Sequence, residues 1–183
     1  MRIYFSGAHS TGKSTLARYV SQKHNLPMVS ETARMILSEQ EMQIDTLRYD
    51  LDVTDRYQQQ VFDRQVLEEQ KYPSFVSDRS IIDVLAYSSQ HARILPQLMR
   101  SPELEPCLSI LREPDSFIFF VKPSKATLRA DGVREAINWE GVVSIDAMIK
   151  FMLRMWDLPH FQINMDNMQE RVQLIDSVLS LQR

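Results

Sequence analysis

The chain alternates between short apolar runs and longer segments in which apolar residues recur every three or four positions. The short runs occupy residues 3–5, 27–29, 75–77, 116–121 and 161–163. Runs of this length predict strands, and the longer spacing predicts helices between them. Because strands that alternate with helices favour a parallel sheet, we expect an α/β fold: a five-stranded parallel sheet with helices on both faces.

The segments between these runs carry the signals of helices. The first helix is expected to run to about His24, and others are expected over residues 33–40 and 54–70. Ser80 precedes an apolar segment and is placed to cap a further helix. Two apolar stripes near the end of the chain predict core-facing helix surfaces. The first consists of Val142, Ile145, Met148, Ile149 and Met152, and the second of Met168, Val172, Ile175 and Leu179.

The composition is that of one globular domain, which we place at residues 1–183. Of the 183 residues, 44% are hydrophobic and 25% are charged, and the net charge of -3 gives no overall attraction to nucleic acid. Cys107 is the only cysteine, which excludes an internal disulfide and a thiolate metal cluster. No apolar run approaches the roughly 20 residues that span a bilayer, and no signal-peptide pattern is present. We therefore expect a cytoplasmic protein with no membrane partner.

The stretch "FSGAHSTGKSTLARYV" contains a G-x-x-x-x-G-K-S motif, although the whole chain has only four glycines. A glycine-rich turn between a strand and a helix directs backbone N–H groups and the positive helix end at a polyphosphate. Lys13 can reach the β- and γ-phosphates, and the Ser14 hydroxyl can coordinate Mg²⁺. A chance match to a short pattern is the alternative. The strand-like "RIYF" before the motif and the helix-like "STLARYV" after it favour a nucleotide site formed by Gly7, Gly12, Lys13, Ser14 and Thr15.

Phosphate binding alone fits a kinase, a switch GTPase or a mechanical ATPase. The guanine-recognition sequence N-K-x-D is missing from the chain, and a mechanical ATPase usually needs more residues for coupling and assembly. A small kinase needs a carboxylate for Mg²⁺ or the acceptor hydroxyl, cations over the transferring phosphoryl group, and a lid. The sequence offers candidates for all three.

The second predicted strand is followed by "SETAR", which contains Glu31 and Arg34. In a doubly wound sheet the carboxyl ends of the strands face the ligand, so both side chains are expected near the acceptor. Glu31 can accept a hydrogen bond from the attacking hydroxyl, and Arg34 can bind substrate or phosphate. The alternative is a carboxylate at a helix start that pairs with an arginine three residues later.

The third predicted strand ends in "VSDRS", which places Asp78 and Arg79 at the same edge of the sheet. Asp78 can hold a Mg²⁺-bound water or the acceptor, and Arg79 can neutralise charge. A structural pair between Asp78 and Arg79 is the alternative. Acid–arginine pairs at two successive strand ends favour a site.

A basic segment, "KPSKATLRADGVREA", follows the fourth predicted strand and contains Arg129, Gly132 and Arg134. Arginines on a segment that closes over a triphosphate stabilise charge in the transition state, so we predict a kinase lid at about residues 123–140. An exposed basic turn is the alternative.

The order of these motifs resembles the ribosylnicotinamide-kinase-like group of P-loop kinases. The resemblance rests on "GAHSTGKS", "SETAR", "FDRQVLEEQ", "VSDRS", "ADGVR" and a closing helix "QERVQLIDSVL". It implies ATP, Mg²⁺ and transfer of a γ-phosphoryl group to a hydroxyl. The residues expected in catalysis are Lys13, Glu31, Asp78, Arg129 and Arg134, those expected to bind substrate are Glu31, Arg34 and Arg79, and those expected at the metal are Ser14 and Asp78.

The group also includes phage enzymes similar to 5-hydroxymethyluridine DNA kinases. The leading expectation is therefore a kinase for a nucleoside-type hydroxyl, with the hydroxymethyl group of 5-hydroxymethyluridine in phage DNA as acceptor and the host cytoplasm as location. A free-nucleoside kinase, for example for ribosylnicotinamide, is the second hypothesis. A second lid arginine expected soon after "DGVR" is missing, which weakens it. A nucleotide-binding regulatory ATPase is the third.

Overall fold

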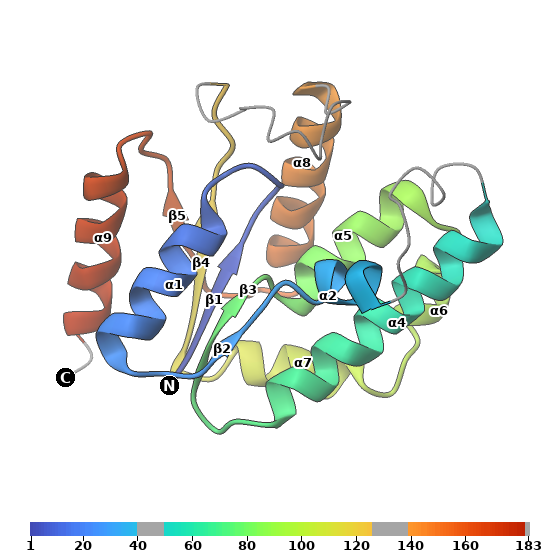
Figure 1. The fold of residues 1–183 in the computed structure, drawn as a ribbon, viewed down its shortest axis with the longest axis horizontal. Coiled ribbons are helices and arrows are strands. Elements are labelled where there is room, and N and C mark those ends of the chain that lie inside the picture. The colour runs from blue at the N-terminus through green and yellow to red at the C-terminus, as the bar shows by residue number, and fades with distance from the viewer. Residues whose placement is uncertain (40–49, 126–138, 182–183) are drawn as a thin grey trace.

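A five-stranded parallel sheet forms the centre of the molecule in the computed structural model, which describes residues 1–39, 50–125 and 139–181 (Figure 1). The strand order is β2-β3-β1-β4-β5. The strands are β1 (Arg2–Ser6), β2 (Met28–Val29), β3 (Phe75–Asp78), β4 (Ser116–Val121) and β5 (Phe161–Ile163). All five predicted runs are strands, and the predicted α/β fold is confirmed.

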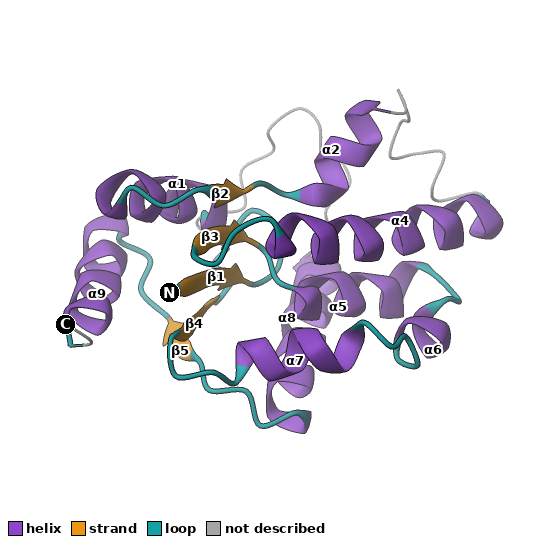
Figure 2. Cartoon of the chain, turned by 90° about the horizontal axis from the view of Figure 1, so that it is seen from below, coloured by secondary structure: helices purple, strands orange, loops and turns teal. Residues whose placement is uncertain are grey.

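Helices cover both faces of this sheet (Figure 2). The helices α1 and α9 lie on one face, and α4, α5, α7 and α8 lie on the other. Their bounds are α1 (Lys13–His24), α2 (Thr32–Glu39), α4 (Leu51–Gln70), α5 (Ile81–His91), α6 (Leu95–Leu98), α7 (Leu104–Leu111), α8 (Trp139–Met155) and α9 (Met168–Ser180). Among the described helices, none is both long enough and apolar enough to cross a membrane.

The sequence pattern missed α6 and α7 and placed the start of α4 three residues late. Pro96 and Pro106 lie in the first turns of these two helices, where a missing N–H breaks no helical hydrogen bond. The start of α4 is set by Asp50, whose carboxylate accepts hydrogen bonds from the backbone N–H groups of Asp52 and Val53 at 2.9 and 3.1 Å.

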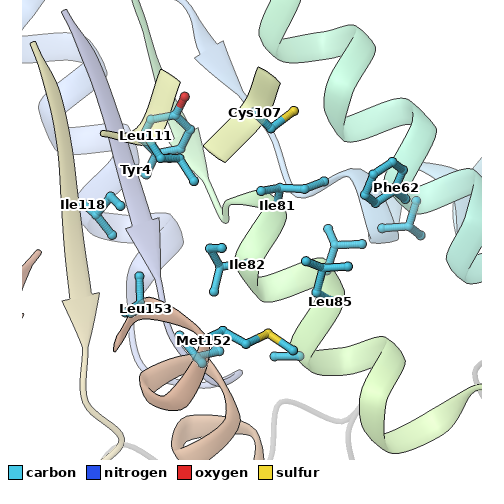
Figure 3. Packing of buried hydrophobic residues seen from close by; sticks show 14 of the residues in the cluster. Tyr4, Phe62, Ile81, Ile82, Leu85, Cys107, Leu111, Ile118, Met152 and Leu153 are labelled. Carbon is cyan, nitrogen blue, oxygen red and sulfur yellow. The ribbon is translucent and has the colours of Figure 1, made fainter. Parts of the chain in front are cut away.

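Alternate residues of β1 enter two separate cores, one on each face of the sheet. Ile3 and Phe5 pack with α1 and α9, whereas Tyr4 packs toward α4, α5, α7 and α8. Figure 3 shows the second core, where Tyr4 lies among residues from α5, α7 and β4. Because β1 is central and fully covered, the loop that follows it has a fixed starting point.

The carboxyl ends of β1, β2 and β3 bring the candidate residues to one edge of the sheet. The G-x-x-x-x-G-K-S loop connects β1 to α1, Glu31 lies between β2 and α2, and Asp78 is the last residue of β3. Ser80 is the N-cap of α5, as predicted, and its backbone N–H and its hydroxyl both donate to the Asp83 carboxylate, at 2.9 and 2.8 Å. The start of α5 is therefore anchored beside this edge.

Candidate active site

The loop between β1 and α1 requires both of its glycines, for different reasons. Gly7 has a φ of 145°, and a Cβ atom there would lie 2.4 Å from the carbonyl oxygen of Val121 at the end of β4. Gly12 has a φ of 88° and is the N-cap of α1. Both glycines were expected to allow a close approach of the backbone to phosphate. At Gly7 the close approach is also to the protein's own backbone.

Lys13 is a buried cation that lies within this loop. Its side chain is 5% exposed, and Nζ donates to the Ala8 carbonyl oxygen at 2.5 Å and to Thr11 Oγ1 at 3.2 Å. Burial, followed by repulsion from Arg79, lowers the pKa of Lys13 from 10.5 to about 8. A polyphosphate that replaced these neutral acceptors would stabilise the charged form of the lysine.

Glu31 is held between two arginines at the pocket. Arg79 Nη2 and Nε lie 2.6 and 2.9 Å from Glu31 Oε1, and Arg34 Nε lies 2.9 Å from Glu31 Oε2. Burial acts to raise the pKa of Glu31, but Arg79, Arg34 and Lys13 outweigh it, so the pKa is lowered. The alternative of an ion pair between Asp78 and Arg79 is not seen among the described residues. Arg79 binds Glu31 instead. The suggested pair of Glu31 with Arg34 does form.

Arg79 adopts an uncommon backbone conformation, with a φ of 107°. A non-glycine residue in this region is strained, and such strain persists where surrounding contacts hold it. The ion pair with Glu31 and the ring of Tyr87, whose centroid lies 4.7 Å from Arg79 Cζ, provide those contacts. Arg79 Nη1 is buried and has no hydrogen-bond partner among the described residues.

Asp78 is 4% exposed. It lines the same pocket as Lys13 and Ser14. A hydroxyl and a carboxylate are oxygen donors of the kind that Mg²⁺ takes together with several waters. Ser14 and Asp78 therefore fit a magnesium ion, although the described chain has no group of three potential metal-binding side chains.

One pocket of about 180 Å³ brings together most of the predicted site. It is lined by His9, Ser10, Thr11, Gly12, Lys13, Ser14, Thr15, Glu31, Arg34, Asp78 and Arg79. Gly7 lies outside this lining, at the start of the loop. A larger surface hollow of about 730 Å³ lies by α6 and contains none of the predicted residues. Arg129 and Arg134, with most of the predicted lid, lie outside the described residues, so their roles stay predictions.

Three residues that the sequence-based analysis did not select also support the loop. The Asp83 carboxylate accepts hydrogen bonds from the Ser6 hydroxyl at 2.7 Å and from Gly7 N at 2.9 Å. The Tyr87 hydroxyl accepts a hydrogen bond from His9 N at 2.9 Å. The position of Asp83 three residues after Ser80 is a capping signal that could have marked it.

Arg171 is the third of these residues and lies on α9. Its side chain is 1% exposed, its Nη1 donates to the Thr11 carbonyl oxygen at 2.6 Å, and its Nε donates to the Met165 carbonyl oxygen at 2.6 Å. No local sequence signal points to Arg171, because its partner Thr11 is 160 residues away.

The sequence matches the AAA domain family over residues 2–171. The chain belongs to this family. No curated protein matches the sequence significantly. A P-loop domain of this kind implies nucleotide binding, which agrees with the buried lysine and the start of α1 at the pocket.

Solved structures of kinases resemble this AAA domain. Deoxyadenosine kinase from M. mycoides, with dCMP and dCDP bound, aligns with a TM-score of 0.71 at 13% identity over 100% of both chains. The NadR protein in complex with NR gives a TM-score of 0.67 at 15% identity, over 91% of this chain and 46% of that one. Shikimate kinase from Aquifex aeolicus gives 0.59 at 14% identity, over 100% of this chain and 96% of the other.

At such identities the likeness shows the fold alone, which is that of the P-loop kinases of nucleosides and other small molecules. The predicted family resemblance is therefore confirmed only at the level of this AAA domain and its fold. The expected links to DNA modification and to phage receive no support from these similarities.

Proposed function

We propose that this AAA domain is a kinase that transfers the γ-phosphoryl group of ATP to a hydroxyl of a nucleoside-type acceptor. The observation that carries the proposal is the position of Glu31. A carboxylate in the same pocket as the P-loop lysine, beyond the end of β2, is placed to meet a second substrate. The same carboxylate can also orient an attacking water, so dependence of ADP formation on an acceptor is what separates a kinase from an ATPase.

The chemistry follows from the charges of these side chains. The acceptor oxygen attacks the γ-phosphorus, the bond to the β–γ bridging oxygen breaks, and ADP leaves with the electron pair. Lys13 and Arg79 stabilise the negative charge on the phosphoryl oxygens. Because the pKa of Glu31 is lowered, it is a weak base, and its main task is to accept a hydrogen bond from the acceptor hydroxyl and orient it. The proton leaves late, in a transition state with little bond formation to the nucleophile, and passes to an oxygen of the transferred phosphoryl group or to solvent.

Mg²⁺ would supply charge neutralisation at the phosphates when it is bound. Ser14 and Asp78 are the residues that we propose to hold it, directly or through water. The P-loop backbone and the start of α1 would bind the phosphates beside the ion.

For the acceptor, we retain a nucleoside-type molecule and treat its form as an experimental question. The hydroxymethyl group of 5-hydroxymethyluridine in DNA remains the specific proposal from the sequence. A free nucleoside is the alternative, and it would reach the pocket by the loop without unstacking. A duplex base would have to leave its stack to enter such a pocket.

The test measures ADP formation with ATP and Mg²⁺ in the presence of DNA containing 5-hydroxymethyluridine, ribosylnicotinamide or deoxyadenosine. We expect stoichiometric ADP and phosphorylated product with one acceptor class. The Glu31→Gln variant should still bind ATP but should transfer phosphate about 100-fold more slowly, since orientation of the hydroxyl is lost.

Glu68→Gln is the matched control for this substitution. Glu68 is also held by two cations, Arg64 and Lys71, each at 2.7 Å, and its side chain has the same 13% exposure as that of Glu31, but it lies outside the pocket lining. The control should retain full activity. ADP formation at the same rate with and without every acceptor would contradict the kinase proposal and favour a regulatory ATPase. Equal losses of transfer rate in Glu31→Gln and Glu68→Gln would contradict the role proposed for Glu31.

A further inference from the structure

Two side chains on one face of α5 hold the nucleotide loop. Asp83 and Tyr87 are four residues apart and therefore lie on the same side of the helix. Asp83 binds Ser6 and Gly7, as described above, and the Tyr87 hydroxyl accepts from His9 N at 2.9 Å and lies 3.0 Å from His9 Nδ1. The first half of the loop is therefore fixed to α5 and not only to its own strand.

The same tyrosine also contacts the cation that holds Glu31. The guanidinium of Arg79 lies over the Tyr87 ring, with Cζ 4.7 Å from the ring centroid. Arg79 in turn binds Glu31 Oε1 through Nη2 and Nε. One side chain thus touches the nucleotide loop with its hydroxyl and the acceptor-side ion pair with its ring.

We propose that Tyr87 is a positioning residue that couples the nucleotide loop to the Arg79–Glu31 pair, so that nucleotide and acceptor bind cooperatively. Cooperative binding of the acceptor rests on the proposed function. The coupling of the nucleotide loop to the Arg79–Glu31 pair does not. A change at His9 on nucleotide binding moves the hydroxyl of Tyr87, and the ring beneath Arg79 must follow. Since coupling between binding sites is reciprocal, the acceptor would strengthen nucleotide binding by the same factor.

The chemistry of the residue explains why a tyrosine fits this position. A phenylalanine would keep the ring beneath Arg79 but would remove the hydroxyl that accepts from His9 N. An arginine at a φ of 107° is held in place only by its contacts, so a small displacement of the ring alters its geometry at Glu31. The loss of one such hydrogen bond corresponds to a change of about two- to tenfold in a binding equilibrium.

The test follows Arg79 directly by NMR of protein labelled with ¹⁵N at arginine Nε, and the signal is assigned by its loss in Arg79→Lys. ADP is the probe, because it occupies the loop without a γ-phosphate, and calorimetry confirms its binding in each variant. In the wild-type protein we expect ADP to shift the Arg79 signal. In Tyr87→Phe the shift should be lost, although ADP still binds.

Tyr19→Phe is the matched control, since the Tyr19 hydroxyl donates to Asp176 at 2.9 Å on the opposite face of the sheet. In Tyr19→Phe, ADP should shift the Arg79 signal as it does in the wild-type protein. A shift that persists in Tyr87→Phe would mean that phosphate acts on Arg79 directly and would overturn the coupling, as would the absence of any wild-type shift with ADP bound.

Cooperative binding is tested with whichever acceptor is phosphorylated in the ADP-formation assay. Its presence should tighten ADP binding in the wild type and in Tyr19→Phe by about two- to tenfold, and should not do so in Tyr87→Phe. Equal tightening in all three proteins would overturn the cooperative role. If no acceptor is phosphorylated but the ADP-induced shift depends on Tyr87, the kinase proposal fails and the loop coupling stands.

Discussion

Lys13 has almost no contact with water, and its charge is balanced only weakly by the protein. Its nearest acceptors are the Ala8 carbonyl oxygen and the Thr11 hydroxyl, which are neutral. Burial lowers its pKa to about 8, so the charged form is the minor one above that pH. A bound polyphosphate favours the charged form and raises the pKa again. Nucleotide binding by this residue is therefore linked to proton uptake.

The first prediction is a fall in nucleotide affinity as the pH rises above about 8. Below that pH Lys13 is already protonated, and above it each binding event must first supply a proton, which weakens binding by up to about tenfold per pH unit. Calorimetric titration with ADP between pH 7 and pH 9.5 measures the slope. Lys13→Arg should bind with little pH dependence, because a guanidinium stays charged. An equal slope in both proteins would assign the titration to another group.

The second prediction separates the two carboxylates of the pocket. Asp78→Asn should lower the rate of phosphoryl transfer, and an excess of Mg²⁺ should restore part of it, because the amide is a weaker metal ligand. The same excess should not rescue Glu31→Gln, whose defect is in orienting the acceptor. Transfer rates at a series of Mg²⁺ concentrations give the comparison. The opposite pattern would exchange the roles of Asp78 and Glu31.

At the scale of elements, the strands were predictable because buried parallel strands read as short apolar runs. The helix after the glycine motif was predictable because the motif marks its start. The helices α6 and α7 were not, because a proline within a first turn cannot be told from one that ends a helix. The pairing of Arg79 with Glu31 was not predictable either, since it depends on a backbone angle that only the folded chain sets.

The third prediction concerns the link between β1 and β4. Gly7→Ala would place a Cβ atom 2.4 Å from the Val121 carbonyl oxygen, whereas Gly12→Ala would meet nothing nearer than 3.4 Å. Both positions have positive φ, so both alanines incur a strain of about 1–2 kcal/mol. We expect Gly7→Ala to lower the free energy of unfolding by about 3 kcal/mol or more, because β1 and β4 must also separate. Urea denaturation of the two variants, with Gly12→Ala as the control, measures the difference.

Across the whole molecule, Arg171 joins the last helix of the described chain to the nucleotide loop. It binds the Thr11 carbonyl oxygen in the loop and the Met165 carbonyl oxygen before α9. Burial lowers the pKa of Arg171, which Asp166 only partly offsets. Among the described residues, the hydrogen-bond partners of its guanidinium are these neutral carbonyl oxygens. A buried cation without a bonded anion adds positive potential at the phosphate site.

The last prediction compares Arg171→Met and Arg171→Lys with Arg154→Met, which removes an exposed arginine from α8. Arg171→Met leaves the Thr11 carbonyl oxygen unsatisfied, which should destabilise the fold by about 1–3 kcal/mol. It should also weaken ADP binding, because both the loop geometry and the positive charge are lost. Arg171→Lys keeps the charge but has no planar fork to span two carbonyl groups, so it should recover ADP affinity more than stability.

Thermal unfolding with and without ADP separates these contributions, and Arg154→Met should leave both the stability and the ADP affinity unchanged. Full ADP affinity in a folded Arg171→Met protein would show that α9 supports the fold without tuning the nucleotide loop.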